Sequence, residues 1–246
     1  MAFAVLTRAL EAESPYATAL APLGLEVVAM PVTRTAPPRD ASALARALEQ
    51  GELAAIVVAS PRAATALIAA RGHAVLPEVW AVGPATHRVL VAAGIPAHQP
   101  ETAHDGASLA HAMVNSRELA GKRVLFPRAE DGRLDAMSIL RAASAEIVDV
   151  IAYRTVAADA HDPAIARGRD LLASGAAAVC IVFAPSQASA LTAVVGPLAA
   201  LPTQFAAIGD TTGAVLREAG IAHVAVATTP TPEGVAQAIS AVYPPR

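Results

Sequence analysis

Four turns in the sequence place a hydroxyl or glycine residue at the start of a predicted helix, directly after an apolar run. Ser60 suits an N-cap and Pro61 the first helical position. Residues 83–86, 209–212 and 231–234 open three further helices. Free N–H groups at helix starts, together with the helix dipole, favour anions. These turns are either ordinary well-capped helix starts or parts of a site for an anionic small molecule.

Three other side chains could contact or protonate such a ligand. Arg8 and Arg128 each follow a predicted strand and can bind a carboxylate or phosphate in a bidentate manner. Tyr153 is one of three tyrosines, and its hydroxyl can donate a proton or a hydrogen bond. Solvated arginines and a tyrosine packed in a hinge would account for the same residues without a ligand.

The familiar catalytic signatures are missing from the sequence. It contains no Gly-x-Gly-x-x-Gly, no Gly-x-x-x-x-Gly-Lys-Ser/Thr and no Gly-x-Ser-x-Gly. His104 and His111 lack a surrounding cysteine or carboxylate cluster, so we expect no metal site and assign all seven histidines to surfaces or loops. Cys180, the single cysteine, lies in an apolar run and is predicted to be a buried strand thiol.

Short apolar runs alternate with helix-length segments along the whole chain. Helix-length segments include residues 41–50, 63–70, 86–93 and 134–143. The predicted strands are residues 3–7, 26–30, 54–59, 79–82, 124–126, 146–151, 179–183, 205–208 and 223–226. This alternation predicts an α/β fold with doubly wound parallel sheets covered on both faces. In such sheets ligands bind outside the carboxyl ends of the strands, where the turns described above lie.

The sequence also repeats itself. Residues 81–95 align without gaps on residues 207–221, with 8 identities in 15 positions. Three further matches keep the same order in both halves. They pair Arg8 with Arg128, residues 26–35 with 146–155, and residues 58–61 with 183–185. Four matches in one order predict an internal duplication and therefore two similar lobes.

Two polar, proline-bearing segments are predicted to connect the lobes. Residues 33–39 and 153–163 occupy equivalent places in the repeat. If the chain crosses at both, one lobe comprises residues 38–155, and the other is discontinuous and combines residues 1–35 with 157–246. Two paired crossings would form a hinge.

Composition limits the classes of protein to which the chain can belong. Its 246 residues suffice for two lobes, and 54% hydrophobic against 16% charged residues excludes disorder. A net charge of -3 argues against a general nucleic-acid binder but leaves an anionic small ligand open. The sequence shows no signal peptide and no apolar stretch of membrane-spanning length. We therefore expect a cytoplasmic protein outside the membrane, and a monomer because no exposed apolar helix stands out.

Seven segments spread along the chain occur together in the order typical of one known family. They are Thr7-Arg8, Ser60-Pro61-Arg62 and residues 81–86, 121–132, 150–156, 205–212 and 227–234. On these segments the sequence resembles the uroporphyrinogen-III synthase family. Their joint occurrence in this order is what makes the resemblance specific.

The resemblance implies two α/β lobes joined by a two-stranded connector, and a cofactor-free reaction on linear hydroxymethylbilane. In that reaction the ring A hydroxyl leaves as water and gives an azafulvene. Ring D then bonds through its substituted carbon, and the resulting spiro intermediate fragments and recloses as uroporphyrinogen III with ring D inverted. The substrate ionises and cyclises readily by itself, so orientation and a single general acid suffice. This chemistry is consistent with the missing catalytic signatures.

The resemblance also implies roles for individual residues. Tyr153 is the expected catalytic residue and assists the loss of water. The residues expected to bind the substrate, chiefly its carboxylates, are Arg8, Ser60, Gly83, Thr86, Arg128, Ser186, Gly209, Thr211 and Thr212. No metal or cofactor is expected, and the expected protein partner is hydroxymethylbilane synthase in a transient contact.

The sequence departs from the family pattern at two turns. Ala184 stands where a serine is frequent, which loses the hydroxyl or moves it to Ser186. Asp210 replaces a usual proline and brings a negative charge beside a site for carboxylates. A non-catalytic two-lobed binder of a tetrapyrrole or another polyanion is therefore the main alternative. A transferase for nucleotide-linked substrates is a third, which the missing phosphate loop and metal-binding carboxylates disfavour.

Overall fold

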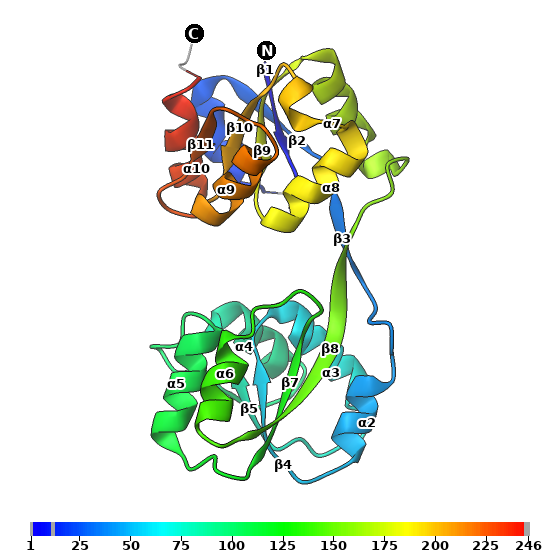
Figure 1. The fold of residues 1–246 in the computed structure, drawn as a ribbon, viewed down its shortest axis with the longest axis vertical. Helices are drawn as coiled ribbons and strands as arrows, with labels where there is room; N and C mark the ends of the chain where they lie inside the picture. Colours follow the sequence, from blue (N-terminus) through cyan, green and yellow to red (C-terminus); the bar gives the residue numbers. More distant parts are fainter. Residues whose placement is uncertain (1, 11–12, 244–246) are drawn as a thin grey trace. The chain divides into compact units, whose positions relative to one another are not determined.

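The structure of the chain is a computed structural model that describes residues 2–10 and 13–243. Its contacts divide the chain into two compact units (Figure 1). The first unit comprises Met1–Arg34 and Val156–Arg246, and the second comprises Thr35–Thr155. Each contains a sheet with helices on both faces, so the predicted α/β class is confirmed.

The first unit contains a five-stranded sheet in the order β11-β10-β9-β1-β2. Its strands, all paired in parallel, are β1 (Ala2–Leu6), β2 (Leu25–Ala29), β9 (Ala177–Val182), β10 (Gln204–Ala207) and β11 (Val224–Val226). Alternate strand residues enter opposite cores: Val5 and Cys180 face one side of the sheet, and Leu6 and Ile181 the other. Helices α7 (Pro163–Ser174), α8 (Pro185–Val195) and α9 (Asp210–Glu218) cover the first side, and α1 (Pro15–Leu20) and α10 (Pro232–Ser240) the second.

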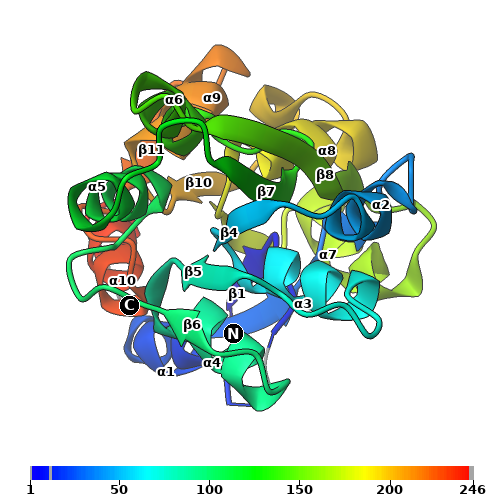
Figure 2. The same cartoon turned by 90° about the horizontal axis from the view of Figure 1, so that it is seen from below.

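The second unit is built around a six-stranded sheet in the order β3-β8-β7-β4-β5-β6. Its strands are β3 (Thr33–Ala36), β4 (Leu53–Val58), β5 (Glu78–Ala81), β6 (Ala97–His98), β7 (Arg123–Ala129) and β8 (Glu146–Ala157). Helices α2 (Ala43–Glu49), α3 (Pro61–Ala70) and α4 (Gly83–Ala92) pack on one side of this sheet. Helices α5 (Gly106–Ser116) and α6 (Asp135–Ala142) lie next to each other on the other side (Figure 2).

The two sheets have corresponding strand orders when the predicted repeat is used to equate their strands. Under that repeat β1 corresponds to β7, β2 to β8, β9 to β4 and β10 to β5, and each equated strand has the equated neighbours. The first unit has the doubly wound order 2-1-3-4-5, and the second is a circular permutation of it. This agreement is what a duplication requires, although the duplication itself remains a prediction. The strand order reverses once in each sheet. The reversal lies between β1 and β9 in the first unit and between β7 and β4 in the second.

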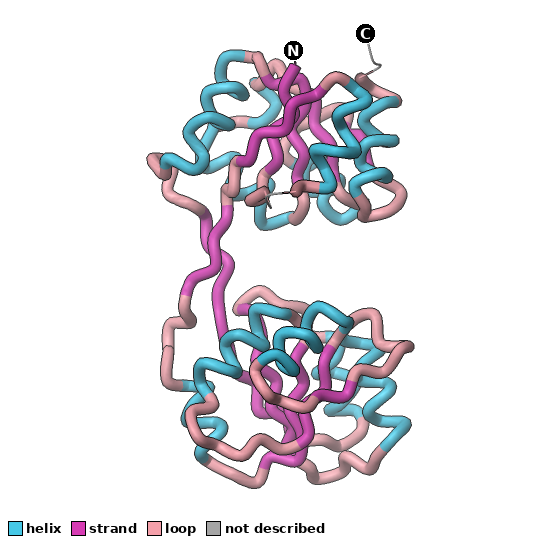
Figure 3. The backbone as a smooth tube through the Cα atoms, turned by 180° about the vertical axis from the view of Figure 1, so that it is seen from behind, coloured by secondary structure: helices cyan, strands magenta, loops and turns pink. Residues whose placement is uncertain are grey.

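Two neighbouring strands, β3 and β8, carry the chain from one unit to the other (Figure 3). The Ala158 N–H donates to the Val32 carbonyl at 2.8 Å, and Arg154 Nε donates to the Pro37 carbonyl at 2.9 Å. The unit boundaries fall between Arg34 and Thr35 and between Thr155 and Val156.

No helix within residues 2–10 and 13–243 combines the length and the apolar character needed to cross a membrane.

Candidate functional site

A cavity of about 360 Å³ opens in the second unit at the carboxyl ends of its strands. Its walls include the ends of β4, β5 and β7, at Ser60, Val82 and Arg128, and the starts of α5 and α6. Tyr153 also lines it from within β8, where that strand pairs with the end of β7 and continues beyond the predicted strand 146–151. The cavity therefore lies where the strand order reverses between β4 and β7, which is where doubly wound sheets bind ligands.

Ser60 and Tyr153 meet in the wall of this cavity. The Ser60 Oγ and the Tyr153 hydroxyl lie 3.1 Å apart, and either atom can be the donor. Ser60 is the N-cap of α3, where its Oγ accepts the Ala63 N–H at 3.1 Å and Pro61 occupies the first helical turn. Both side chains are partly exposed, so a ligand in the cavity can reach the pair.

Arg128 is held in place by four hydrogen bonds. Its Nε and Nη2 donate to the two carboxylate oxygens of Asp149 at 2.7 and 2.9 Å, and its Nη1 donates to the carbonyls of Ala129 and Glu130 at 2.8 and 3.0 Å. The hydrogen bond that Arg128 donates to Asp149 raises the pKa of Arg128 above its usual value. A guanidinium has five N–H donors, so one remains for a ligand. The Glu130 N–H also donates to the Tyr153 carbonyl at 3.0 Å, and this ties the arginine's loop to the tyrosine.

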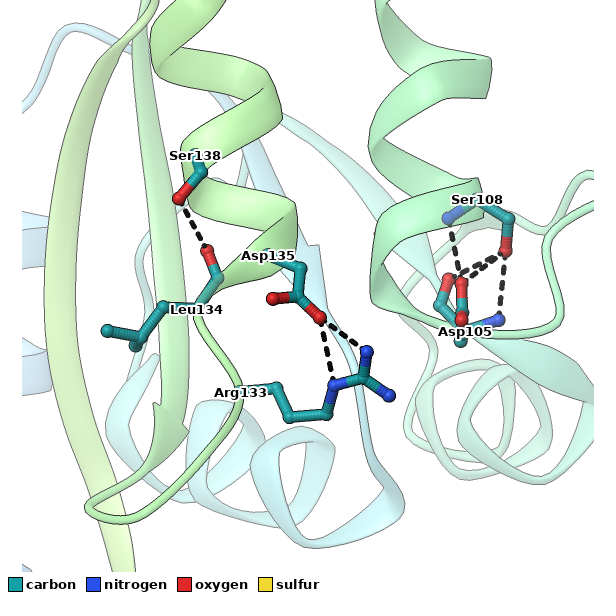
Figure 4. A network of polar contacts seen from close by, with 6 residues as sticks. All are labelled: Asp105, Ser108, Arg133, Leu134, Asp135 and Ser138. Carbon is teal, nitrogen blue, oxygen red and sulfur yellow. Dashed lines mark hydrogen bonds and ion pairs between the residues drawn. The ribbon is translucent and has the colours of Figure 1, made fainter.

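Four residues that the sequence analysis did not assign to the site, His104, Asp105, Arg133 and Asp135, also line the cavity. Asp105 caps α5 by accepting the Ser108 N–H at 2.8 Å, and Arg133 Nε donates to Asp135 at 2.9 Å (Figure 4). The hydrogen bonds from Ser108, and to a lesser degree the charge of Arg133, lower the pKa of Asp105. The spacing of Asp105 and Ser108 before an apolar helix is a capping-box signal that could have located this helix start.

The remaining predicted residues of the second unit lie outside the cavity wall. Gly83 opens α4 with a φ of 69°, and Thr86 in the same helix is buried with 2% of its surface exposed. The structure thus brings together Ser60, Arg128 and Tyr153 of the predicted site, and not Gly83 or Thr86.

In the first unit, Arg8 lies exposed just beyond the carboxyl end of β1. Its guanidinium carbon is 5.3 Å from the centre of the Phe183 ring and 5.8 Å from that of the Tyr16 ring. The two rings meet edge to face with their centres 5.0 Å apart. Burial raises the pKa of Tyr16, and the nearby Arg8 opposes that shift. The arginine therefore rests on an aromatic support at the edge where doubly wound sheets bind ligands.

The other predicted residues of the first unit occupy the starts of α8 and α9. Ser186 is partly exposed near the start of α8, whose N-cap Ala184 provides no side-chain hydrogen bond. Gly209 is the N-cap of α9 in an extended conformation. Thr211 is exposed, whereas Thr212 is buried with 3% of its surface exposed.

Gln187 is a residue of this edge that the sequence did not reveal. Its Oε1 accepts hydrogen bonds from the Thr7 hydroxyl at 2.6 Å and from the Phe183 N–H at 3.0 Å. Thr7 is fully buried, and its hydroxyl also lies 3.1 Å from the Ile181 carbonyl. Gln187 thus joins the ends of β1 and β9 at the strand-order reversal. A glutamine inside a helix carries no sequence signal for such a role.

The sequence matches the family model described as uroporphyrinogen-III synthase HemD over residues 14–237. The uroporphyrinogen-III synthetase of Helicobacter pylori 26695 has a similar structure, with a TM-score of 0.65 and 15% identity, covering 98% of this chain and 100% of that one. A mutant uroporphyrinogen III synthase of the extremely thermophilic bacterium Thermus thermophilus gives a TM-score of 0.58 and 18% identity, covering 98% of both chains. At these identities the two structures establish the fold, and the sequence finds no match among curated proteins. The family model spans nearly the whole sequence, and the chain therefore belongs to the uroporphyrinogen-III synthase family.

Proposed function

We propose that this protein is a uroporphyrinogen-III synthase, a cofactor-independent cyclising lyase that converts hydroxymethylbilane into uroporphyrinogen III and water. The observation that carries the proposal is the family match over residues 14–237. A cavity at the strand-order reversal of the second unit, with a tyrosine hydroxyl in its wall, supports it independently.

Tyr153 is our candidate for the general acid. Its phenol donates a proton to the hydroxyl oxygen of ring A, and the C–O bond breaks with its electron pair on the oxygen. Water leaves, and the azafulvenium cation of ring A is balanced by the Tyr153 phenolate. Ring D bonds through its substituted carbon, and the spiro intermediate fragments and recloses with ring D inverted. The proton lost at the final closure returns to the phenolate, so the enzyme is regenerated.

The carboxylates of the substrate need hydrogen-bond donors, and we propose the following residues for this role. Arg8 on its aromatic support and the remaining N–H of Arg128 are the charged donors. The partly exposed Ser186 and the exposed Thr211 contribute hydroxyls, and the turns at Gly83 and Gly209 contribute backbone N–H groups. Thr86 and Thr212 are buried, so their proposed part is to hold these two helix starts in shape.

The test is a coupled assay in which hydroxymethylbilane synthase generates the substrate in place. After oxidation of the products, chromatography separates isomer I from isomer III. We expect predominantly isomer III, because spontaneous closure of the substrate gives isomer I. If folded protein yields isomer I alone, the proposal is wrong, and a non-catalytic binder of a tetrapyrrole becomes the better explanation.

We further propose that the enzyme acts in the cytoplasm as a monomer and meets hydroxymethylbilane synthase transiently. A substrate that closes spontaneously to the wrong isomer favours rapid transfer between the two enzymes. If transfer is direct, an inactive variant of this protein added in excess will compete with the active form and raise the share of isomer I. An unchanged isomer ratio would argue for free diffusion of the substrate.

A further inference from the structure

We propose that Ser60 is a positioning residue for Tyr153. Its hydroxyl donates a hydrogen bond to the phenolic oxygen, so that the tyrosine's own proton points into the cavity and the phenolate left after proton transfer is stabilised. This inference rests on the proposed function, and it gives Ser60 a role other than contact with the substrate.

The first step of the argument is a count of donors and acceptors on the Ser60 hydroxyl. That group has one proton and two lone pairs, and the Ala63 N–H at 3.1 Å occupies one lone pair. The contact with the Tyr153 hydroxyl at 3.1 Å then uses either the second lone pair or the proton. Once Tyr153 has released its proton, its oxygen can only accept, so Ser60 must be the donor. The proton of Ser60 is therefore required in the phenolate state.

The second step concerns the helix that Ser60 caps. Pro61 has no N–H, and the Ala63 N–H is taken by the Ser60 Oγ. The partial positive charge at the N-terminus of α3 therefore acts on the cavity partly through the Ser60 hydroxyl. A hydroxyl that accepts a hydrogen bond becomes a better donor, because linked hydrogen bonds polarise one another. Ser60 is in this way a stronger donor than an isolated serine would be.

The third step separates this role from capping alone. In the first unit α8 also opens with a proline, Pro185, yet its N-cap is Ala184 and forms no side-chain hydrogen bond. An α/β turn of this kind therefore forms in this protein without a capping hydroxyl. It follows that Ser60→Ala should fold, and that a loss of activity in this variant can be separated from a loss of structure.

The experiment compares three substitutions at Ser60 in the coupled isomer assay. Ser60→Ala should lower kcat by roughly 10-fold or more and change KM by less than about twofold, because the lost interaction acts in the transition state. Ser60→Thr keeps both the cap and the donor, so it should restore kcat to within about threefold of wild type. Ser60→Asp keeps the cap but has no proton to donate, so kcat should fall at least as far as in Ser60→Ala. In Ser60→Ala the solvent deuterium isotope effect on kcat should increase.

Two further variants complete the design. Tyr153→Phe combined with Ser60→Ala should be no slower than Tyr153→Phe alone, because the two residues act as a unit. Asp162 caps α7 ahead of Pro163 by accepting the Ala164 N–H at 2.9 Å, so Asp162→Ala loses the same kind of cap and should keep wild-type kcat.

Three results would overturn the inference: a wild-type kcat in Ser60→Ala, a wild-type kcat in Ser60→Asp, or losses that multiply in the double variant. These failures differ from failure of the proposed function, in which wild-type protein itself would give no isomer III. They also differ from failure of the proposed acid, in which Tyr153→Phe would retain full activity.

Discussion

At the residue scale, the proposed reaction depends mainly on one protein group, the hydroxyl of Tyr153. The substrate carries its own leaving group and nucleophile, so the protein needs to orient it and to protonate one oxygen. Tyr153 lies in the cavity wall, its hydroxyl meets Ser60, and its carbonyl accepts the Glu130 N–H. The tyrosine is therefore fixed at both its backbone and its side chain.

We predict that Tyr153→Phe lowers kcat by roughly 100-fold and leaves KM nearly unchanged, because the substitution removes only the proton and its oxygen. Initial rates of isomer III formation measure the effect. Tyr243→Phe is the matched control, since Tyr243 packs against the core of the first unit and should keep the wild-type rate. A Tyr153→Phe enzyme with the wild-type rate would remove this residue from the catalytic role.

A second prediction concerns the pair of Arg128 and Asp149, whose side chains are 14% and 31% exposed. Asp149→Asn breaks the bidentate interaction and leaves the Arg128 guanidinium without its counter-charge. The free energy of unfolding of the second unit should fall by about 1–3 kcal/mol. Urea unfolding followed by Trp80 fluorescence measures the change, because Trp80 is the single tryptophan and lies in the second unit.

The control for this prediction lies on the same strand. Glu146 of β8 lies 3.3 Å from Arg123, but its side chain is 64% exposed. Solvent screens such pairs, so Glu146→Gln should change the unfolding free energy by less than about 0.5 kcal/mol. Equal losses of unfolding free energy in the two variants would show that the Arg128–Asp149 pair stabilises the second unit no more than the exposed Arg123–Glu146 pair does.

The sequence could predict that Ser60, Arg128 and Tyr153 lie near one edge of a sheet, because each follows a predicted strand or opens a predicted helix. It could not predict their hydrogen-bond partners. Ser60 and Tyr153 are 93 residues apart, and Arg128 and Asp149 are 21 apart on neighbouring strands. Such contacts depend on register and rotamer, which no local pattern encodes. For the same reason Arg133 and Asp105 were missed as cavity residues.

At the element scale, the nine predicted strands are present because each is an apolar run between turn residues. Within residues 2–10 and 13–243, the two strands that the sequence did not predict lack this signal. β3 is polar and lies beside prolines, and β6 is only two residues long at the edge of its sheet. Both owe their conformation to pairing with a neighbouring strand, so the surrounding sheet and not the local sequence determines them.

The turns at Gly83 and Gly209, which the predicted repeat equates, allow a prediction at this scale. Gly83 has a φ of 69°, in the left-handed region, whereas Gly209 has a φ of 178° and is extended. A Cβ would meet no atom within 4 Å at either position, so only the backbone conformation distinguishes them. Gly83→Ala should lower the free energy of unfolding by about 1–2 kcal/mol, and Gly209→Ala should cost far less.

Chemical denaturation of the two glycine variants, followed by far-ultraviolet circular dichroism, provides the comparison. If both substitutions destabilise equally, the left-handed conformation at Gly83 is not what distinguishes the turns. In that case the two turns would contribute equally to stability, as the repeat suggests, despite their different backbone angles.

At the scale of the whole molecule, each unit contains its own spectroscopic or chemical probe. Cys180 is the only cysteine and lies in the first unit, fully buried in the middle of its sheet, whereas Trp80 lies in the second. Burial raises the pKa of the Cys180 thiol to about 12, so the reactive thiolate is scarce in the native state. We predict that thiol reagents label Cys180 only as the first unit unfolds.

This prediction is measured by labelling with a chromogenic disulfide reagent across a urea series. The labelling rate should remain low until the far-ultraviolet signal of unfolding appears, and then rise with it. Rapid labelling in the absence of denaturant would mean that the sheet of the first unit opens locally at β9.

The last prediction concerns the division of the chain. The second unit is continuous in sequence and has an apolar core on each face of its sheet, centred on Ile56 and Leu67 on one side and on Val57 and Met113 on the other. The first unit is made of two segments and can close its sheet only after β9 has been added beside β1. We therefore predict that a fragment of residues 38–155 folds by itself, whereas residues 1–35 alone do not.

The measurement is urea unfolding of the 38–155 fragment, followed by Trp80 fluorescence and by circular dichroism. Coincident sigmoidal transitions, with a midpoint close to that of Trp80 in the full chain, are expected if the second unit holds its own core. The fragment omits β3, which lies beyond β8 at the edge of the sheet, so a small loss of stability is consistent with the prediction. A fragment without a cooperative transition would contradict it, and would mean that the second unit depends on the first for its fold.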